Sequence, residues 1–266
     1  MTSASRKKAR YIEPHRWSET QLHAVGATLS SQCQIPASDP AEELISAILN
    51  TSRPYSPAFM DLFPTAELGD IAIAAYYSKN LDPTLPRSET EVRRRMCINL
   101  INCTLSYLCP HYHFLPQPLK LHCGKATISW EPRGYIGAHV WLVVPQNPKS
   151  HFAEETAFAI SIAQEFHVGK TEQEFEVWLV SVRRDKAAIV HATVSGALLA
   201  ALDRTEASKL QPGLAIGQFG DVKVQASNEY CLRDTTERTV FMGVLDGVAN
   251  WANSRTDEQV RAVSWK

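Results

Sequence analysis

The spacing of apolar residues changes several times within Gly124–Leu202, and this pattern constrains the fold more than any other feature of the chain. Apolar and polar residues alternate through Lys125–Glu131, as in a strand with one buried face. Ala138–Val144 is apolar throughout, which is typical of a central strand covered on both faces. Helical spacing follows in His151–Phe166, and strand spacing returns in Phe175–Ser195. This order predicts a β-β-α-β-β core.

A hairpin is expected at the end of this core, where two apolar runs flank a short polar stretch. Val177–Val182 and Ala188–Val194 are separated by Arg183-Arg184-Asp185-Lys186, which has the composition of a turn. In the preceding helix, Glu154, Ser161 and Glu165 fall at positions that place them together on a face toward solvent. Downstream, the spacing predicts a short helix at Leu198–Leu202, a strand near Val222–Val224 and a closing helix at Thr239–Ala252.

The region before Pro110 carries the start and stop signals of helices. Ser18 and Gln21 have the spacing of a capping box, and Leu22, Val25 and Leu29 follow on one helical face. Three more helices are predicted: one from Asp39-Pro40, one over Ala66–Ser78, and one that begins at Ser88 with Glu91 and ends at Pro110.

These patterns divide the chain into consecutive regions of different composition. Residues 1–16 form a basic tail that is expected to be disordered, and residues 17–109 form a helical portion. Residues 110–118 are a proline-rich connector, and residues 119–266 carry the sheet. We expect the helices and the sheet to pack as one compact unit. The predicted class is therefore α+β (mixed α/β), with an N-terminal helical portion packed on a mixed sheet.

Composition and charge indicate the cellular compartment in which such a protein is expected. Its 266 residues are 44% hydrophobic and 21% charged, which is ordinary for a globular protein with a full core. The formal net charge of −1 gives no overall field that would attract nucleic acid or an anionic membrane. No apolar run is long enough for a membrane helix, and the N-terminus lacks the apolar stretch of a signal peptide. We therefore expect an intracellular protein of the cytoplasm or nucleus, without a membrane partner.

Basic residues cluster at two places where a partner could bind. The tail carries a run that resembles a nuclear-import signal, formed by Arg6, Lys7, Lys8 and Arg10. The predicted hairpin turn carries a second cluster, formed by Arg183, Arg184 and Lys186. This second cluster could contact a nucleic-acid phosphate or an acidic protein surface, although runs of charge are also typical of a solvated face.

Cysteine and histidine residues gather around the connector. These are the ligands that zinc prefers, and the candidates are Cys109, His111, His113 and Cys123. Their spacing matches none of the paired patterns of zinc sites. Buried thiols and exposed histidines explain the same residues without a metal. The sequence therefore predicts no metal and no cofactor, with zinc at these residues as the alternative.

Complete catalytic motifs are missing from the sequence. The phosphate-binding loop, the deaminase signature and the G-x-S-x-G turn of serine hydrolases each lack required residues. Polar residues on strands can still converge in a pocket. The residues that could form such a site are Lys125, Glu131, His139 and His191.

The order of hairpin strands, crossover helix and further strand is similar to that of nucleases with the restriction-endonuclease-like fold. Those enzymes carry an aspartate on one strand and Glu-x-Lys on the next, which hold Mg²⁺ and stabilise developing charge. The corresponding strand here reads His139-Val140-Trp141-Leu142 and carries neither group. The resemblance is one of topology, and it implies a degenerate, catalytically inactive core of this kind as the alternative fold.

Two functions of different class are consistent with these observations. The first is a non-catalytic intracellular regulatory or adaptor protein that acts through protein or nucleic-acid contacts. The alternative is an enzyme for a small molecule or a nucleic acid, with a site assembled from scattered residues of the sheet. A deep cleft containing Glu131 and His139 would favour the enzyme.

Overall fold

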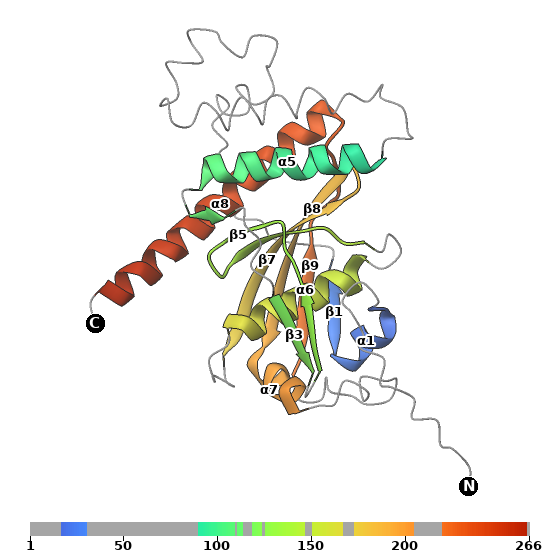
Figure 1. Ribbon diagram of the computed structural model, residues 1–266, viewed down its shortest axis with the longest axis vertical. Helices are drawn as coiled ribbons and strands as arrows, with labels where there is room; N and C mark the ends of the chain where they lie inside the picture. The colour runs from blue at the N-terminus through green and yellow to red at the C-terminus, as the bar shows by residue number, and fades with distance from the viewer. Residues whose placement is uncertain are drawn as a thin grey trace.

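The computed structural model describes residues 17–30, 90–109, 111–113, 119–123, 126–146, 151–166, 173–204 and 220–264. Its centre is an eight-stranded sheet, and a two-stranded sheet is separate from it (Figure 1). The strands are β1 (Ala27–Ser30), β2 (Tyr112–His113), β3 (Leu119–Cys123), β4 (Ala126–Trp130), β5 (Gly134–Ile136), β6 (Val140–Val143), β7 (Glu174–Arg183), β8 (Lys186–Ser195), β9 (Val222–Ala226) and β10 (Tyr230–Cys231). The helices are α1 (Glu19–Ala24), α5 (Thr90–Leu108), α6 (His151–Phe166), α7 (Gly196–Arg204) and α8 (Thr235–Ser264).

The larger sheet contains both parallel and antiparallel pairs. Its strand order is β1-β9-β8-β7-β6-β5-β2, and β10 pairs with one end of β8. β6 and β7 are parallel and are joined by α6, and β1 is parallel to β9. The other neighbouring strands are antiparallel. Helices combined with a mixed sheet confirm the α+β class at this level.

β7 and β8 form a hairpin of two ten-residue strands. Their pairing runs from Glu174 opposite Ser195 to Arg183 opposite Lys186, and the turn lies between them. Arg184 in this turn has a φ of 66°, in the left-handed region that most residues avoid. The hairpin lies where the two apolar runs predict it.

The two faces of the larger sheet bury separate hydrophobic clusters, because successive side chains along a strand point to opposite faces. On one face, Trp141 and Leu179 pack with α6 and α7. On the other face, Val140 and Leu142 pack with α5 and α8. All four residues of β6 are buried. The apolar run Ala138–Val144 therefore contains a central strand that is covered on both faces, as predicted.

Helix α6 is covered on more sides than its sequence indicates. The predicted solvated face is wrong for two of its three residues, because Glu154 and Ser161 are only 1% and 0% exposed, whereas Glu165 is exposed as predicted. The strand expected at Lys125–Glu131 is present as β4, but it pairs with β3 outside the larger sheet. Trp130 of β4 stacks on Phe158 of α6 with 4.2 Å between ring centroids, and its Nε1 donates to Ser161 Oγ at 2.6 Å. The small sheet thus covers Ser161, and the carboxylate of Glu154 accepts a hydrogen bond from the backbone N–H of Gln146 at 2.9 Å.

The first described helix is shorter than the apolar stripe predicts. Its expected start is present, because the backbone N–H of Ser18 donates to Gln21 Oε1 at 2.9 Å. Gly26 has a φ of 64°, a conformation in which glycine commonly ends a helix. The following residues form β1, so Leu29 lies in a strand and is 58% exposed. The prediction that Leu29 continues a helical face is therefore wrong.

The remaining helices lie where apolar spacing predicts them, with shifted ends. α5 ends at Leu108, before Pro110, whereas α8 begins before Thr239 and continues to Ser264. α8 begins earlier because Asp234 Oδ1 accepts a hydrogen bond from the backbone N–H of Glu237 at 2.9 Å. None of the helices among the described residues is both long enough and apolar enough to cross a bilayer.

Several expectations fall on residues that the structure does not describe. They concern the basic tail, most of the proline-rich connector, the start signal at Ser88, and the helices at Asp39-Pro40 and Ala66–Ser78.

Candidate functional site

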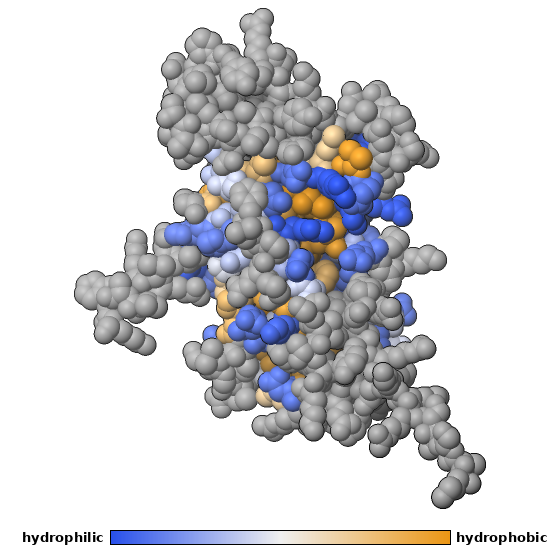
Figure 2. Space-filling model, viewed as in Figure 1, coloured by the Kyte–Doolittle hydropathy of each residue, from blue (hydrophilic) through white to orange (hydrophobic). Residues whose placement is uncertain are grey.

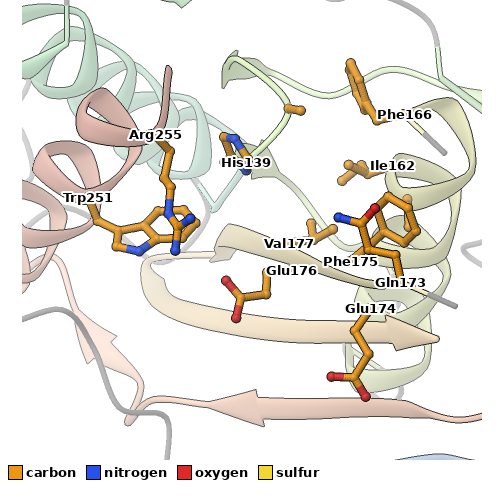
Figure 3. A pocket seen from close by; sticks show the side chains of 12 residues that line it. His139, Ile162, Phe166, Gln173, Glu174, Phe175, Glu176, Val177, Trp251 and Arg255 are labelled. Carbon is orange, nitrogen blue, oxygen red and sulfur yellow. The ribbon is translucent and has the colours of Figure 1, made fainter. Parts of the chain in front are cut away.

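A cavity of about 400 Å³ lies beside the first residues of β7 (Figure 3). β6 begins at Val140, which is opposite Trp178, whereas β7 already begins at Glu174. Residues 174–177 therefore extend beyond the first residue of β6, where β6 offers them no partner. The C-terminal turn of α6, the turn between β5 and β6, and α8 enclose the resulting space, which we name the β7-edge cleft.

One wall of the β7-edge cleft is apolar. Its side chains come from the last turns of α6 and from alternate residues of β7, namely Ile162, Ala163, Phe166, Phe175 and Val177. Phe166 is 39% exposed, an unusual position for a phenylalanine on a helix that is otherwise so well buried. This wall offers apolar surface to a ligand.

The opposite wall combines charge with an aromatic ring. Glu174 and Glu176 extend from β7, and Trp251 and Arg255 come from α8 (Figure 3). The Arg255 guanidinium lies 5.7 Å from the centroid of the Trp251 ring, within the range of a cation–π contact. His139, from the turn before β6, meets the same ring edge-on at 5.6 Å between centroids.

Backbone groups of β7 also face the cleft. Trp178 N donates to His139 O at 2.8 Å toward β6, whereas Gln173 O accepts from Gly196 N at 3.0 Å toward the β8 side. Because backbone groups alternate between the two edges of a strand, the N–H and C=O groups of Glu174 and Glu176 point toward the cleft. Within the described residues these four groups have no strand partner. His139 N cannot serve as one, since it donates to Ile136 O at 3.2 Å.

Of the predicted catalytic candidates, the structure places only His139 in the cleft. His191 lies on β8 and stacks on Trp178 at 4.3 Å between centroids, with its Nδ1 3.4 Å from Gln225 Oε1. Glu131 is exposed, follows β4 and does not line the cleft, and Lys125 lies outside the described residues. The four candidates are therefore not brought together as one site among the described residues.

The basic hairpin cluster is largely engaged with carboxylates. Arg183 Nη2 lies 2.6 Å from Glu155 Oε2, and Arg183 Nη1 lies 2.7 Å from Glu229 Oε1. Lys186 Nζ lies 3.3 Å from the same Glu229 carboxylate. Burial would raise the pKa of Glu229, but the hydrogen bonds and charges of Arg183 and Lys186 outweigh it and lower that pKa. Arg184, at the turn itself, is exposed.

The candidate zinc ligands occupy different environments. The buried Cys109 Sγ lies 2.5 Å from Asn253 Oδ1. His111 and His113 are exposed, and the His113 ring lies 5.0 Å from that of Tyr135. Cys123 is in β3, and its side chain is not described. No group of three or more histidine, cysteine, aspartate or glutamate side chains suited to a metal ion occurs in the described part of the chain.

The predicted nuclear-import signal lies outside the described residues; it is formed by Arg6, Lys7, Lys8 and Arg10. The cleft residues that sequence reasoning missed are Glu174, Glu176, Trp251 and Arg255. A signal for the first two was present, because Glu-Phe-Glu-Val at the start of β7 alternates acidic and apolar residues. No protein-family model and no curated protein sequence matches this chain.

Proposed function

We propose that this chain is a non-catalytic intracellular regulatory or adaptor protein, and that its β7-edge cleft binds an extended segment of a partner protein. The observation that carries the proposal is the set of backbone groups of Glu174 and Glu176 that face a cleft with an apolar wall. A peptide that adds a strand to a sheet gains affinity from main-chain hydrogen bonds and specificity from side-chain pockets. Both elements are present at this edge.

A protein partner fits the charges better than a nucleic acid does. Two carboxylates, Glu174 and Glu176, border the cleft and would repel phosphate. At the hairpin, Arg183 and Lys186 already pair with carboxylates, so contact with a phosphate there would have to displace them. These observations favour the protein-contact form of the adaptor hypothesis.

An enzyme remains the second candidate, because His139 and Glu176 line the same cleft. A histidine and a carboxylate in one cleft can act as acid and base if both reach a substrate. The interpretation of the sheet as a degenerate restriction-endonuclease-like core also stays a prediction. Peptide binding that depends on the backbone of β7 would favour the adaptor over both.

The adaptor proposal can be tested by comparing two variants of Glu176. Both Glu176→Pro and Glu176→Thr remove the carboxylate, but only proline also removes the N–H that faces the cleft. That N–H is not used in pairing with β8, so the hairpin ladder is kept in both variants. Nine-residue peptides are selected without bias on the full chain, and their affinities for both variants are measured by fluorescence anisotropy. We expect Glu176→Pro to bind about fivefold more weakly than Glu176→Thr, the equivalent of one hydrogen bond.

A second measurement uses the unmodified chain and does not depend on whether the proline variant folds. In the free protein, the amides of Glu174 and Glu176 should exchange with solvent much faster than those of Phe175 and Val177, which pair with β8. A bound peptide should slow the first two amides and leave the others unchanged. Equal binding to both variants without such protection, or a selection that yields no peptide, would refute the proposal.

A further inference from the structure

The two sides of β7 differ in chemistry along the β7-edge cleft. Phe175 and Val177 belong to the face that packs against α6, where Phe166 extends the apolar wall. Glu174 and Glu176 lie on the opposite face, with Trp251 and Arg255 of α8 (Figure 3). A strand that pairs with this edge would alternate its own side chains between the same two environments.

We infer that the partner segment is an extended peptide in which apolar residues alternate with lysine or arginine. This inference rests on the proposed function. Side chains on one face of two paired strands lie about 5 Å apart, so residues beside Phe175 and Val177 must be apolar to share that wall. Residues beside Glu174 and Glu176 gain from a positive charge, and acidic residues there are repelled.

The surroundings of the two carboxylates make Glu176 the stronger anchor. Lys223 Nζ lies 3.7 Å from Glu174 Oε1, so part of the Glu174 charge is already compensated. No ion pair is formed by Glu176 with any described residue. Arg255 lies over the Trp251 ring rather than against this carboxylate. The exposed charge of Glu176 is therefore available to a basic side chain of the partner.

Figure 2 shows apolar residues in an area of the upper half that hydrophilic residues border, and smaller apolar areas mixed with hydrophilic residues lower down. The specificity argued here depends on alternation within one strand rather than on a broad apolar patch. A basic but unpatterned peptide should consequently bind more weakly than a patterned one of the same composition.

The inference is tested with four fluorescein-labelled probes and the full chain. One probe alternates lysine with valine, one alternates glutamate with valine, and one alternates threonine with valine. The fourth has the composition of the first, with the lysines in one block and the valines in another. We expect the lysine–valine alternation to bind about fivefold more tightly than the threonine–valine probe at low salt, and the acidic probe to bind most weakly.

Two variants of the chain test whether the preference for the lysine–valine probe comes from the cleft. Glu176→Gln should remove most of the advantage of the lysine–valine probe and leave the threonine–valine probe unchanged. Glu131→Gln is the matched control, because Glu131 is exposed and lies outside the cleft. It should leave the binding of all four probes unchanged.

Each other outcome overturns a defined part of the reasoning. If the block probe binds as tightly as the alternating one, general charge attraction explains the binding and the inferred pattern is wrong. If the neutral probe equals the basic one, the charge preference is wrong, while the proposed function stands. A further outcome is that the unbiased selection yields peptides that slow hydrogen exchange of the Glu176 amide while none of the four probes binds. In that case only this inference fails. If no probe binds and the unbiased selection also yields no peptide, the inference and the proposed function both fail.

Discussion

Replacing Glu155 with glutamine is expected to destabilise the protein by about 3 kcal/mol, because Glu155 is the buried centre of a hydrogen-bonded ion pair. Its side chain is 1% exposed, against 12% for that of Arg183. Glu155 Oε1 accepts from Arg183 Nε at 2.8 Å and from Ser181 Oγ at 2.5 Å, and Oε2 accepts from Arg183 Nη2 at 2.6 Å. One carboxylate thus satisfies three donors.

The magnitude follows from what the glutamine leaves unpaired. Its single carbonyl oxygen replaces one acceptor, while its amide N–H groups must face a donor of Arg183 or Ser181. Losing one partner of a buried pair costs about 3–5 kcal/mol in general. Arg183 keeps its second carboxylate, Glu229, at 2.7 Å, so the cost lies at the lower end of that range.

The free energy of unfolding can be measured by urea titration with tryptophan fluorescence. Glu229→Gln is the matched control, because Glu229 is 38% exposed and an exposed pair contributes less than about 1 kcal/mol. The double variant Glu155→Leu with Arg183→Met removes both buried charges and should be more stable than Glu155→Gln alone. If Glu155→Gln costs no more than Glu229→Gln, the buried pair does not stabilise the fold as argued.

Three further predictions concern buried or half-buried positions. Gly134→Ala should destabilise the protein by about 1–3 kcal/mol, since the added methyl group would overlap the Tyr112 hydroxyl; an unchanged melting temperature would contradict this. Burial, assisted by the charge of Arg183, lowers the pKa of His151. The unfolded chain therefore binds this proton first, and stability should fall as the pH drops below about 6.5. His151→Gln should reduce that fall between pH 7.5 and 5.5 in urea titrations, and an identical fall would exclude His151 as its source. Burial raises the pKa of the Cys97 thiol to about 12, so a thiol reagent at pH 8 should label it only after unfolding, as mass spectrometry can show.

Local sequence patterns predict the elements whose apolar runs and turns lie within one short segment of the chain. The β7–β8 hairpin and the buried strand β6 follow from apolar runs and a polar turn. α1 is shorter than predicted because a glycine at position 26, in the left-handed conformation, ends a helix whose apolar spacing would allow it to continue. The start of α8 had a readable signal in Asp234 and Glu237, which lie three residues apart as in a capping box.

Features that depend on distant parts of the chain could not be predicted in this way. Glu154 and Ser161 have the spacing of a solvated face, but Trp130 of the small sheet packs over Ser161, and Glu154 accepts from the backbone N–H of Gln146. The β7-edge cleft depends on the register that pairs Val140 with Trp178, and no local sequence pattern fixes where one strand ends beside another. The alternation in Glu174–Val177 indicates a two-faced strand, but not that one of its edges has no strand partner among the described residues.

The proposed binding cleft lies far from the buried ion pair. Both Glu155 and Phe166 lie on α6, but near opposite ends of it, and Arg183 and Glu174 are the two ends of β7. Nine steps along a strand span about 30 Å, well beyond the separation of about 10 Å at which mutational effects usually become additive. The ion pair therefore holds the closed end of the hairpin on α6, while the other end presents the cleft. A loss of stability from Glu155→Gln should leave peptide affinity unchanged, so a change in affinity caused by Glu176→Pro can be assigned to the open strand edge itself.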